Sequence, residues 1–321
     1  MQRLLLAVVL ALTLGRTAPA QNEGAVPTQV LVNIDPKSAP PADASALTVT
    51  VDNRRQPLTS WSPVLPAGAQ VALLFDDGLR QSLGGELKNL RAFVQGLPPG
   101  IEVLVGYMQN GRVVQAQPFT ADHALAASTL RLPQGIPGGS ASPYFCLSDF
   151  VKKWPESAET QPNAAPTIVR DAAAGPHKAR FVLMISNGVD PYNGSTSLAN
   201  EDSPYVQAAV TDAQRAGVAV YSIYYTDAGI RGPSASLSGQ SYLAQLSQAT
   251  GGANYFEGTG NPVSMAPFLN AFQQALVATY IATFDAPAGK DPARELVRLK
   301  FTSATKTKLH APDEVRPGNQ E

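Results

Sequence analysis

Short buried strands and amphipathic helices alternate through the middle of the chain. Continuous apolar runs, typical of strands that are covered on both faces, lie at 71–75, 181–185 and 218–225. After Ser82, Ser142 and Ser203, apolar residues recur at spacings of three and four, which predicts helices. This alternation predicts an α/β fold with a doubly wound, mostly parallel sheet.

One pair of strands departs from the parallel pattern. Asn110-Gly111 lies between the apolar runs 101–107 and 112–116, and this dipeptide between two such runs is a strong hairpin signal. The second strand of the pair is therefore predicted to be antiparallel. A plain dinucleotide-binding fold would have a helical crossover at this point.

The two ends of the chain carry further strand candidates. They lie at 28–35 and 46–52 near the amino terminus, and at 282–285, 296–302 and 306–310 near the carboxyl terminus. Each set has too few strands to be stable alone, so we expect the two sets to join in one small β layer beside the main sheet. The predicted organisation is a signal peptide (1–20), an N-terminal β segment (21–67), the α/β domain (68–280) and a C-terminal β segment with a tail (281–321).

The first twenty residues fit a secretory signal peptide. A basic start, an apolar run from Leu4 to Leu14 and Ala18-Pro19-Ala20 occur in the expected order, which predicts cleavage between Ala20 and Gln21. The apolar run is too short to span a bilayer. We therefore expect a secreted or periplasmic protein without a membrane span.

Composition narrows the classes of partner. Without residues 1–20 the chain has 22 basic and 25 acidic residues, a net charge of −3, which disfavours nucleic acid and anionic membranes. The single Cys146 cannot form an internal disulfide, and we interpret it as a small buried residue in a helix.

Three polar turns follow buried strands or precede a helix. They are Asp76-Asp77-Gly78-Leu79-Arg80, Gly138-Gly139-Ser140-Ala141-Ser142 and Ser186-Asn187-Gly188. In a doubly wound sheet such turns converge on one edge, where ligands bind. The predicted binding surface at this edge consists of Asp76, Asp77, Gly78, Arg80, Ser140, Ser142, Asn187 and Asp190.

The order and spacing of these elements resemble the von Willebrand factor type A family over residues 68–280. In that family an aspartate, two serines, a threonine and a later aspartate surround a magnesium or manganese ion, whose open position takes a carboxylate from a protein partner. The resemblance places Asp76 at the first aspartate, Gly78 and Arg80 at the serines, Ser140 at the threonine and Asn187 at the later aspartate. It implies a Rossmann-like type A fold and a role in protein binding.

The metal ligands of the family are largely substituted in this chain. Only Asp76 matches, with Ser140 as a conservative replacement. Magnesium demands near-octahedral oxygen ligation, whereas Gly78 has no side chain and Arg80 brings a fixed positive charge. We therefore expect a degenerate metal site and no cofactor; in the alternative, Asp76 and Ser140 contribute to weak Mg²⁺ or Mn²⁺ binding.

The place of Arg80 allows three interpretations. Its guanidinium can pair with Asp76 or Asp77 and take the place of the metal. Asp77 and Asp190 can instead replace the lost ligands, so that a weak metal site survives. In the third interpretation Arg80 points into solvent.

Aromatic residues and a polar loop accompany these turns. Tyr144, Phe145, Tyr192 and Tyr205 are either contact residues for a protein partner or packing residues. The loop 190–202 matches no known calcium loop, and we interpret it as a solvated polar loop.

Enzyme signatures are weak in this sequence. His123, His177 and His310 lack ligand spacing, which disfavours zinc. Ser140 lacks the Gly-x-Ser-x-Gly elbow, and the turn after residues 71–75 has neither Gly-x-Gly-x-x-Gly nor a Walker lysine. The sequence thus predicts a secreted, non-enzymatic module that recognises a protein or a surface. The alternatives are a metal-assisted hydrolase that uses Asp76 and Asp77, and a structural periplasmic component.

Overall fold

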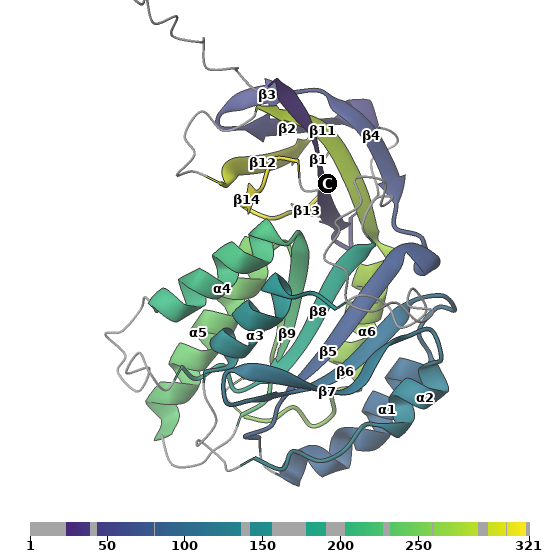
Figure 1. The fold of residues 1–321 in the computed structure, drawn as a ribbon, viewed down its shortest axis with the longest axis vertical. Coiled ribbons are helices and arrows are strands. Elements are labelled where there is room, and N and C mark those ends of the chain that lie inside the picture. The colour runs from purple at the N-terminus through teal and green to yellow at the C-terminus, as the bar shows by residue number, and fades with distance from the viewer. Residues whose placement is uncertain are drawn as a thin grey trace, which may run out of the picture.

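The computed structural model describes ten segments of the 321-residue chain (Figure 1). These segments are residues 24–38, 44–79, 81–135, 142–155, 178–190, 203–226, 232–258, 260–287, 295–305 and 307–318. The predicted signal peptide and two of the predicted binding residues, Arg80 and Ser140, lie outside them.

A six-stranded sheet forms the centre of the molecule, in the order β10-β9-β8-β5-β6-β7. Its strands are β5 (Ala69–Asp76), β6 (Glu102–Gln109), β7 (Arg112–Thr120), β8 (Ala179–Ser186), β9 (Val218–Tyr224) and β10 (Asn254–Tyr255). Neighbouring strands are parallel except β6 and β7. Every residue of β5 is buried, as its apolar run predicted.

The antiparallel hairpin is confirmed. β6 and β7 pair in opposite directions around Asn110 and Gly111, whose φ angles are 47° and 80°. Both residues are in the left-handed region, which asparagine and glycine tolerate better than other residues.

Helices cover both faces of the central sheet (Figure 1). One face packs against α1 (Leu87–Gln95), α2 (His123–Ser128) and α6 (Ala266–Val277). The other packs against α3 (Pro143–Lys152), α4 (Pro204–Arg215) and α5 (Gly232–Ala249). Short 3₁₀ helices lie at η1 (Ala44–Ala46), η2 (Pro66–Gly68) and η3 (Gln81–Glu86).

The predicted helix starts at Ser142 and Ser203 are confirmed. The side chains of Ser142 and Ser203 cap α3 and α4 by accepting backbone N–H groups of the first turn. At the start of α6 the N-cap position belongs to Met265, and the hydroxyl of the preceding Ser264 accepts the backbone N–H of Ala266 at 3.2 Å. The backbone N–H of Met265 donates to the Glu86 carboxylate at 2.8 Å. A distant acid in the chain and a local serine therefore both accept backbone N–H groups at the start of α6.

The predicted fold class is wrong in its account of the chain ends. It has one small β layer, whereas the described residues form two further four-stranded sheets, ordered β13-β1-β11-β4 and β14-β12-β2-β3. Their strands are β1 (Ala25–Ile34), β2 (Leu47–Val51), β3 (Arg54–Gln56), β4 (Leu58–Pro63), β11 (Thr279–Pro287), β12 (Val297–Ser303), β13 (Leu309–His310) and β14 (Glu314–Val315). The protein is thus mixed α/β, with one mostly parallel sheet and two antiparallel sheets.

The two antiparallel sheets share a core, so we call them the sandwich. Its buried residues include Val30 and Val32 from one sheet and Val49, Val51 and Leu299 from the other. The sequence prediction missed β3 and β4, because prolines around them suggested a loop. Both are edge strands, where a missing N–H donor is tolerated.

The sandwich lies at the end of the central sheet where its parallel strands begin. The backbone N–H groups of Val64, just before β5, and of Ile34 donate to the carbonyl oxygens of Thr279 and Ala278. β5 and β8 run away from this junction, so their carboxyl ends lie at the far end of the molecule (Figure 1). The described helices include none that is both long enough and apolar enough to cross a bilayer.

Candidate functional site

Six of the eight predicted binding residues are described: Asp76, Asp77, Gly78, Ser142, Asn187 and Asp190. They lie at the carboxyl ends of β5 and β8 and at the start of α3. We call this surface the top face and define it by the turns 76–79, 131–135 and 186–190 with the first turns of α3 and α4. Arg80, Ser140 and Tyr192 lie outside the described residues, so the three interpretations of Arg80 stay predictions.

Asp76 links the ends of two neighbouring strands. One carboxylate oxygen accepts the backbone N–H of Gly78 at 2.9 Å, and the other accepts the hydroxyl of Ser186 at 3.0 Å. The Ser186 hydroxyl oxygen in turn accepts the backbone N–H of Gly188. Asp76 is buried, with 5% of its surface exposed. Through these hydrogen bonds its carboxylate stabilises the turns after β5 and β8.

Asp77 forms an ion pair with Arg131, a residue that the sequence analysis did not select. The Arg131 Nη1 atom lies 2.8 Å from the carboxylate, which also accepts hydrogen bonds from the Gln109 side chain and the backbone N–H of Gln134. Asp77 is 1% exposed. A guanidinium therefore does pair with a carboxylate of this turn, and it comes from the segment after α2.

The segment 131–135 is fastened to the end of β5 at a second point. The backbone N–H of Gly135 donates to the carbonyl oxygen of Asp77 at 2.8 Å. A Cβ atom at Gly135 would lie 2.6 Å from that oxygen, so only glycine allows this approach. In the sequence Leu130-Arg131-Leu132-Pro133, a charged residue lies between apolar neighbours. This pattern is the one local signal for the contact between Arg131 and Asp77.

The Arg131 side chain is held in a defined position by Tyr107. Its guanidinium carbon lies 3.6 Å from the centre of the Tyr107 ring, within the range of a cation–π contact. The Tyr107 hydroxyl donates to the carbonyl oxygen of Arg131 and accepts its backbone N–H. Burial raises the pKa of Tyr107, while the hydrogen bond and the charge of Arg131 oppose this rise.

The turn after β8 is a packed structural element. Gly188 has a φ of 67° and lies against α5, where a Cβ atom on Gly239 would be 2.1 Å from the carbonyl oxygen of Asn187. The Asn187 side chain accepts the backbone N–H of Val189. Asn187 is half-buried and therefore presents only part of its surface to a partner.

Asp190 belongs to the start of α4. Its carboxylate accepts the hydroxyl of Ser203, the residue that caps this helix, at 2.7 Å. Asp190 is fully buried. This contact links the described end of the turn after β8 to the next helix.

A tyrosine and a cysteine beneath the top face stay protonated at neutral pH. Burial raises the pKa of Tyr144 well above its usual value, and Asp190, Tyr242 and Asp76 raise it further. Its hydroxyl donates to the carbonyl oxygen of Gly188 at 2.8 Å. Burial, followed by the Asp76 charge, also raises the pKa of Cys146 to about 12, so this thiol is no nucleophile at neutral pH.

The described residues do not fit a divalent metal ion. Asp76 accepts hydrogen bonds from its own chain, Asp77 pairs with a guanidinium, and Gly78 supplies no side chain. Within the described segments, no three His, Cys, Asp or Glu side chains come together as a metal-binding group. Magnesium needs a near-octahedral set of oxygen ligands.

Two of the predicted rim aromatics are partly exposed and contact each other. Phe145 and Tyr205 pack edge to face, with ring centres 4.5 Å apart, between the first turns of α3 and α4. Tyr144 is fully buried and is therefore a packing residue.

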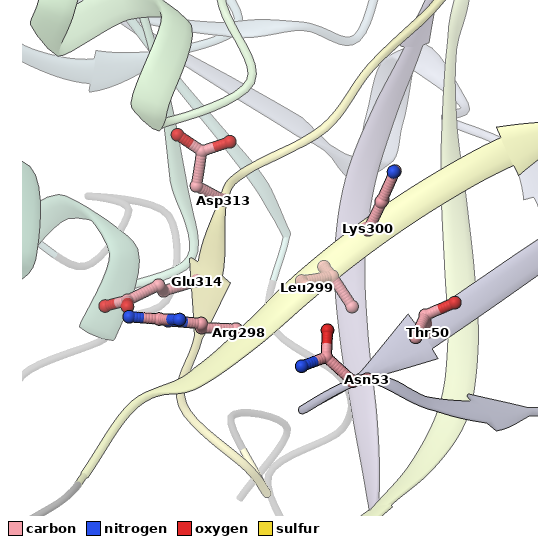
Figure 2. Close-up of a pocket in the computed structure, with 7 residues that line it drawn as sticks. All are labelled: Thr50, Asn53, Arg298, Leu299, Lys300, Asp313 and Glu314. Atoms are coloured by element: carbon pink, nitrogen blue, oxygen red, sulfur yellow. The ribbon is translucent and has the colours of Figure 1, made fainter.

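A separate cavity lies in the sandwich, on β12, β14 and the turn after β2 (Figure 2). It has a volume of about 250 Å³ and is lined by Thr50, Asn53, Arg298, Leu299, Lys300, Asp313 and Glu314. Arg298 and Glu314 lie opposite each other on paired strands. Burial raises the pKa of Asp313, with a further increase from Glu314. None of the predicted binding residues lines this cavity.

No protein-family model matches the sequence, and the search of curated proteins gives no match. Among solved structures, the chain is similar to the ArnB paralog VWA2 from Sulfolobus acidocaldarius, with 10% identity, a TM-score of 0.37 and coverage of 91% of this chain and 76% of that one. It is also similar to a von Willebrand factor type A structure from Catenulispora acidiphila, with 11% identity, a TM-score of 0.38 and coverage of 92% and 74%. A third match is the SpRpn10 VWA domain, with 9% identity, a TM-score of 0.35 and coverage of 63% and 93%.

These three matches are type A domains, the family that the sequence resembles. At identities of 9–11% and TM-scores of 0.35–0.38, these similarities carry no argument about the family of this chain or about what it binds. The observed central sheet has the antiparallel edge hairpin that Asn110-Gly111 predicted. The described residues thus form a mostly parallel central sheet with an antiparallel edge hairpin, to which a sandwich is added.

Proposed function

We propose that this chain is a secreted, non-enzymatic module that recognises a protein partner through its top face, without a functional metal site. The observation that carries the proposal is the burial and hydrogen bonding of the two carboxylates that are candidates for reactive groups. Asp76 and Asp77 are buried and accept hydrogen bonds from their own chain. They stabilise the conformation of the top face. This role suits a recognition surface better than acid–base chemistry on a substrate.

The surface around these carboxylates supports the proposal. Gln134 is exposed, and Arg131, Asn187, Phe145 and Tyr205 are partly exposed. Arginine and aromatic side chains are enriched at protein interfaces. The sandwich lies at the other end of the central sheet and leaves this surface open to a partner (Figure 1).

Site-specific photo-crosslinking tests the recognition surface. A benzophenone side chain at exposed Gln134 is expected to form a defined adduct in the cells that produce the protein, and excess unlabelled protein is expected to compete for it. The matched control carries the same group at Thr59, an exposed residue of the sandwich. Equal adducts from both positions, or none from Gln134, would overturn the proposal.

Calorimetric titration tests the metal-independent part of the proposal. Magnesium, manganese and calcium are each expected to give no saturable heat with the mature chain. Micromolar binding that is lost in Asp76→Ala would show a working metal site. A screen with esters, peptides and phosphate esters tests the non-enzymatic part, which turnover dependent on Asp76 would refute.

Secretion is tested by amino-terminal sequencing of the exported protein. We expect the mature chain to begin at Gln21. Export with an intact amino terminus, or retention inside the cell, would contradict this part of the proposal.

A further inference from the structure

We propose that Arg131 is a metal-independent receptor for a carboxylate side chain of the partner protein. This inference rests on the proposed function and names the chemistry that the top face recognises. It follows from the fixed position, the free edge and the surroundings of one guanidinium.

The guanidinium is positioned before any partner arrives. Nη1 donates both to Asp77 and to the carbonyl oxygen of Leu132, at 2.8 and 2.7 Å. The Tyr107 ring supports its face, and Phe75 in turn stacks on Tyr107 with ring centres 5.4 Å apart. Little side-chain freedom remains to be lost on binding, and this raises the affinity for a partner.

The opposite edge of the guanidinium is available. Nε and Nη2 of Arg131 make no hydrogen bond to any described residue, and 29% of the side chain is exposed. Two parallel N–H groups at one edge match the two oxygens of a carboxylate, which is the geometry of bidentate pairing. The edge that Asp77 leaves open is therefore suited to a second, external carboxylate.

The local charge favours a carboxylate over a phosphate. Asp77 contacts the same guanidinium. A phosphate dianion would meet more repulsion from this acid than a singly charged carboxylate would. An acidic side chain on a protein partner is thus the best match for this position.

Arginine-detected NMR of the mature, ¹⁵N-labelled chain tests the inference. The probe is an end-blocked pentapeptide with a single glutamate between glycines and serines, titrated at constant ionic strength. We expect the Arg131 Nε–H resonance to move saturably, with a midpoint at least about tenfold lower than that of Arg112, the fold-change that one charge-assisted hydrogen bond provides. Arg112 is an exposed arginine at the start of β7 and serves as the internal reference.

Variants and competitors separate the chemistry of this site from simple charge. Arg131→Lys keeps the charge but not the paired N–H groups, so it should weaken binding about tenfold, whereas Arg112→Gln should leave it unchanged. The same peptide with glutamine should cause no shift, and EDTA should not alter the result. Full binding by Arg131→Lys, loss of binding in EDTA, or tighter binding of acetate or inorganic phosphate than of the peptide would each overturn the inference.

The two proposals can fail separately. If the Gln134 adduct forms while the Arg131 resonance does not respond to the peptide, only the carboxylate receptor is wrong. If Arg131 binds the peptide while the Gln134 and Thr59 positions give equal adducts, the top face is not the recognition surface of the chain.

Discussion

The pairing of Asp77 with Arg131 can be measured by a double-mutant cycle. The perturbations are Asp77→Ala, Arg131→Ala and the two together. Asp77 accepts three hydrogen bonds and its side chain is 2% exposed, so its removal should lower the free energy of unfolding by about 3 kcal/mol. Arg131→Ala leaves that carboxylate buried without its cation, and we expect a loss of about 2 kcal/mol, because two hydrogen bonds to Asp77 remain.

The coupling energy between the two residues should be about 2 kcal/mol, in the range of a charge-assisted hydrogen bond. Urea unfolding followed by circular dichroism gives each free energy, provided that the m-value is the same for all variants. The matched control is the cycle for Lys153 and Asp149, an exposed pair one helical turn apart, which should couple by less than about 0.5 kcal/mol.

A coupling below about 0.5 kcal/mol for Asp77 and Arg131 would refute the reasoning. The coupling energy of this pair would then equal that of an ordinary surface ion pair, and the guanidinium would not be held in a fixed position. The receptor inferred for Arg131 would lose its preorganisation at the same time.

Three further predictions concern packing and protonation. The buried hydroxyl of Tyr224 has no hydrogen-bond partner among the described residues, so Tyr224→Phe should leave the urea midpoint unchanged or raise it. Tyr144→Phe loses the hydrogen bond to the carbonyl oxygen of Gly188 and should cost about 1 kcal/mol. Gly239→Ala would place a methyl group 2.1 Å from the carbonyl oxygen of Asn187 and should cost about 2 kcal/mol or more in the same assay. Burial, helped by a nearby lysine, lowers the pKa of His310, so stability should be full above about pH 6.5 and fall as the pH drops below it. His310→Asn should flatten this fall in urea midpoints measured between about pH 7 and pH 5, and an unchanged slope would contradict the assignment to this histidine.

Local sequence determined the elements whose signals lie within a few neighbouring residues. The hairpin at Asn110-Gly111 follows from backbone conformations that these two residues tolerate. The buried strand ending at Asp76 follows from its apolar run, and the starts of α3 and α4 follow from Ser142 and Ser203. Such signals can be interpreted from sequence because the interacting groups are close in the chain.

The ends of the chain show where such signals become insufficient. β4 is short, lies at a sheet edge and ends in Pro63, so its pattern resembles a loop. It becomes a strand because β11, more than 200 residues away, supplies the hydrogen bonds. The sandwich is therefore decided by pairing between the two ends of the chain, and neither end alone predicts it.

The candidate site divides in the same way. The sequence by itself placed Asp76 and Asp77 at the end of a buried strand. In an α/β fold, a run of apolar residues followed by two acids is typical of a buried strand that ends at the surface. It directed attention to Arg80 as the neighbouring cation, since periodicity and spacing describe only nearby residues. The tertiary structure brought Arg131, 54 residues further along the chain, against Asp77. Only packing decides such a contact, because it depends on where the segment after α2 crosses the end of β5.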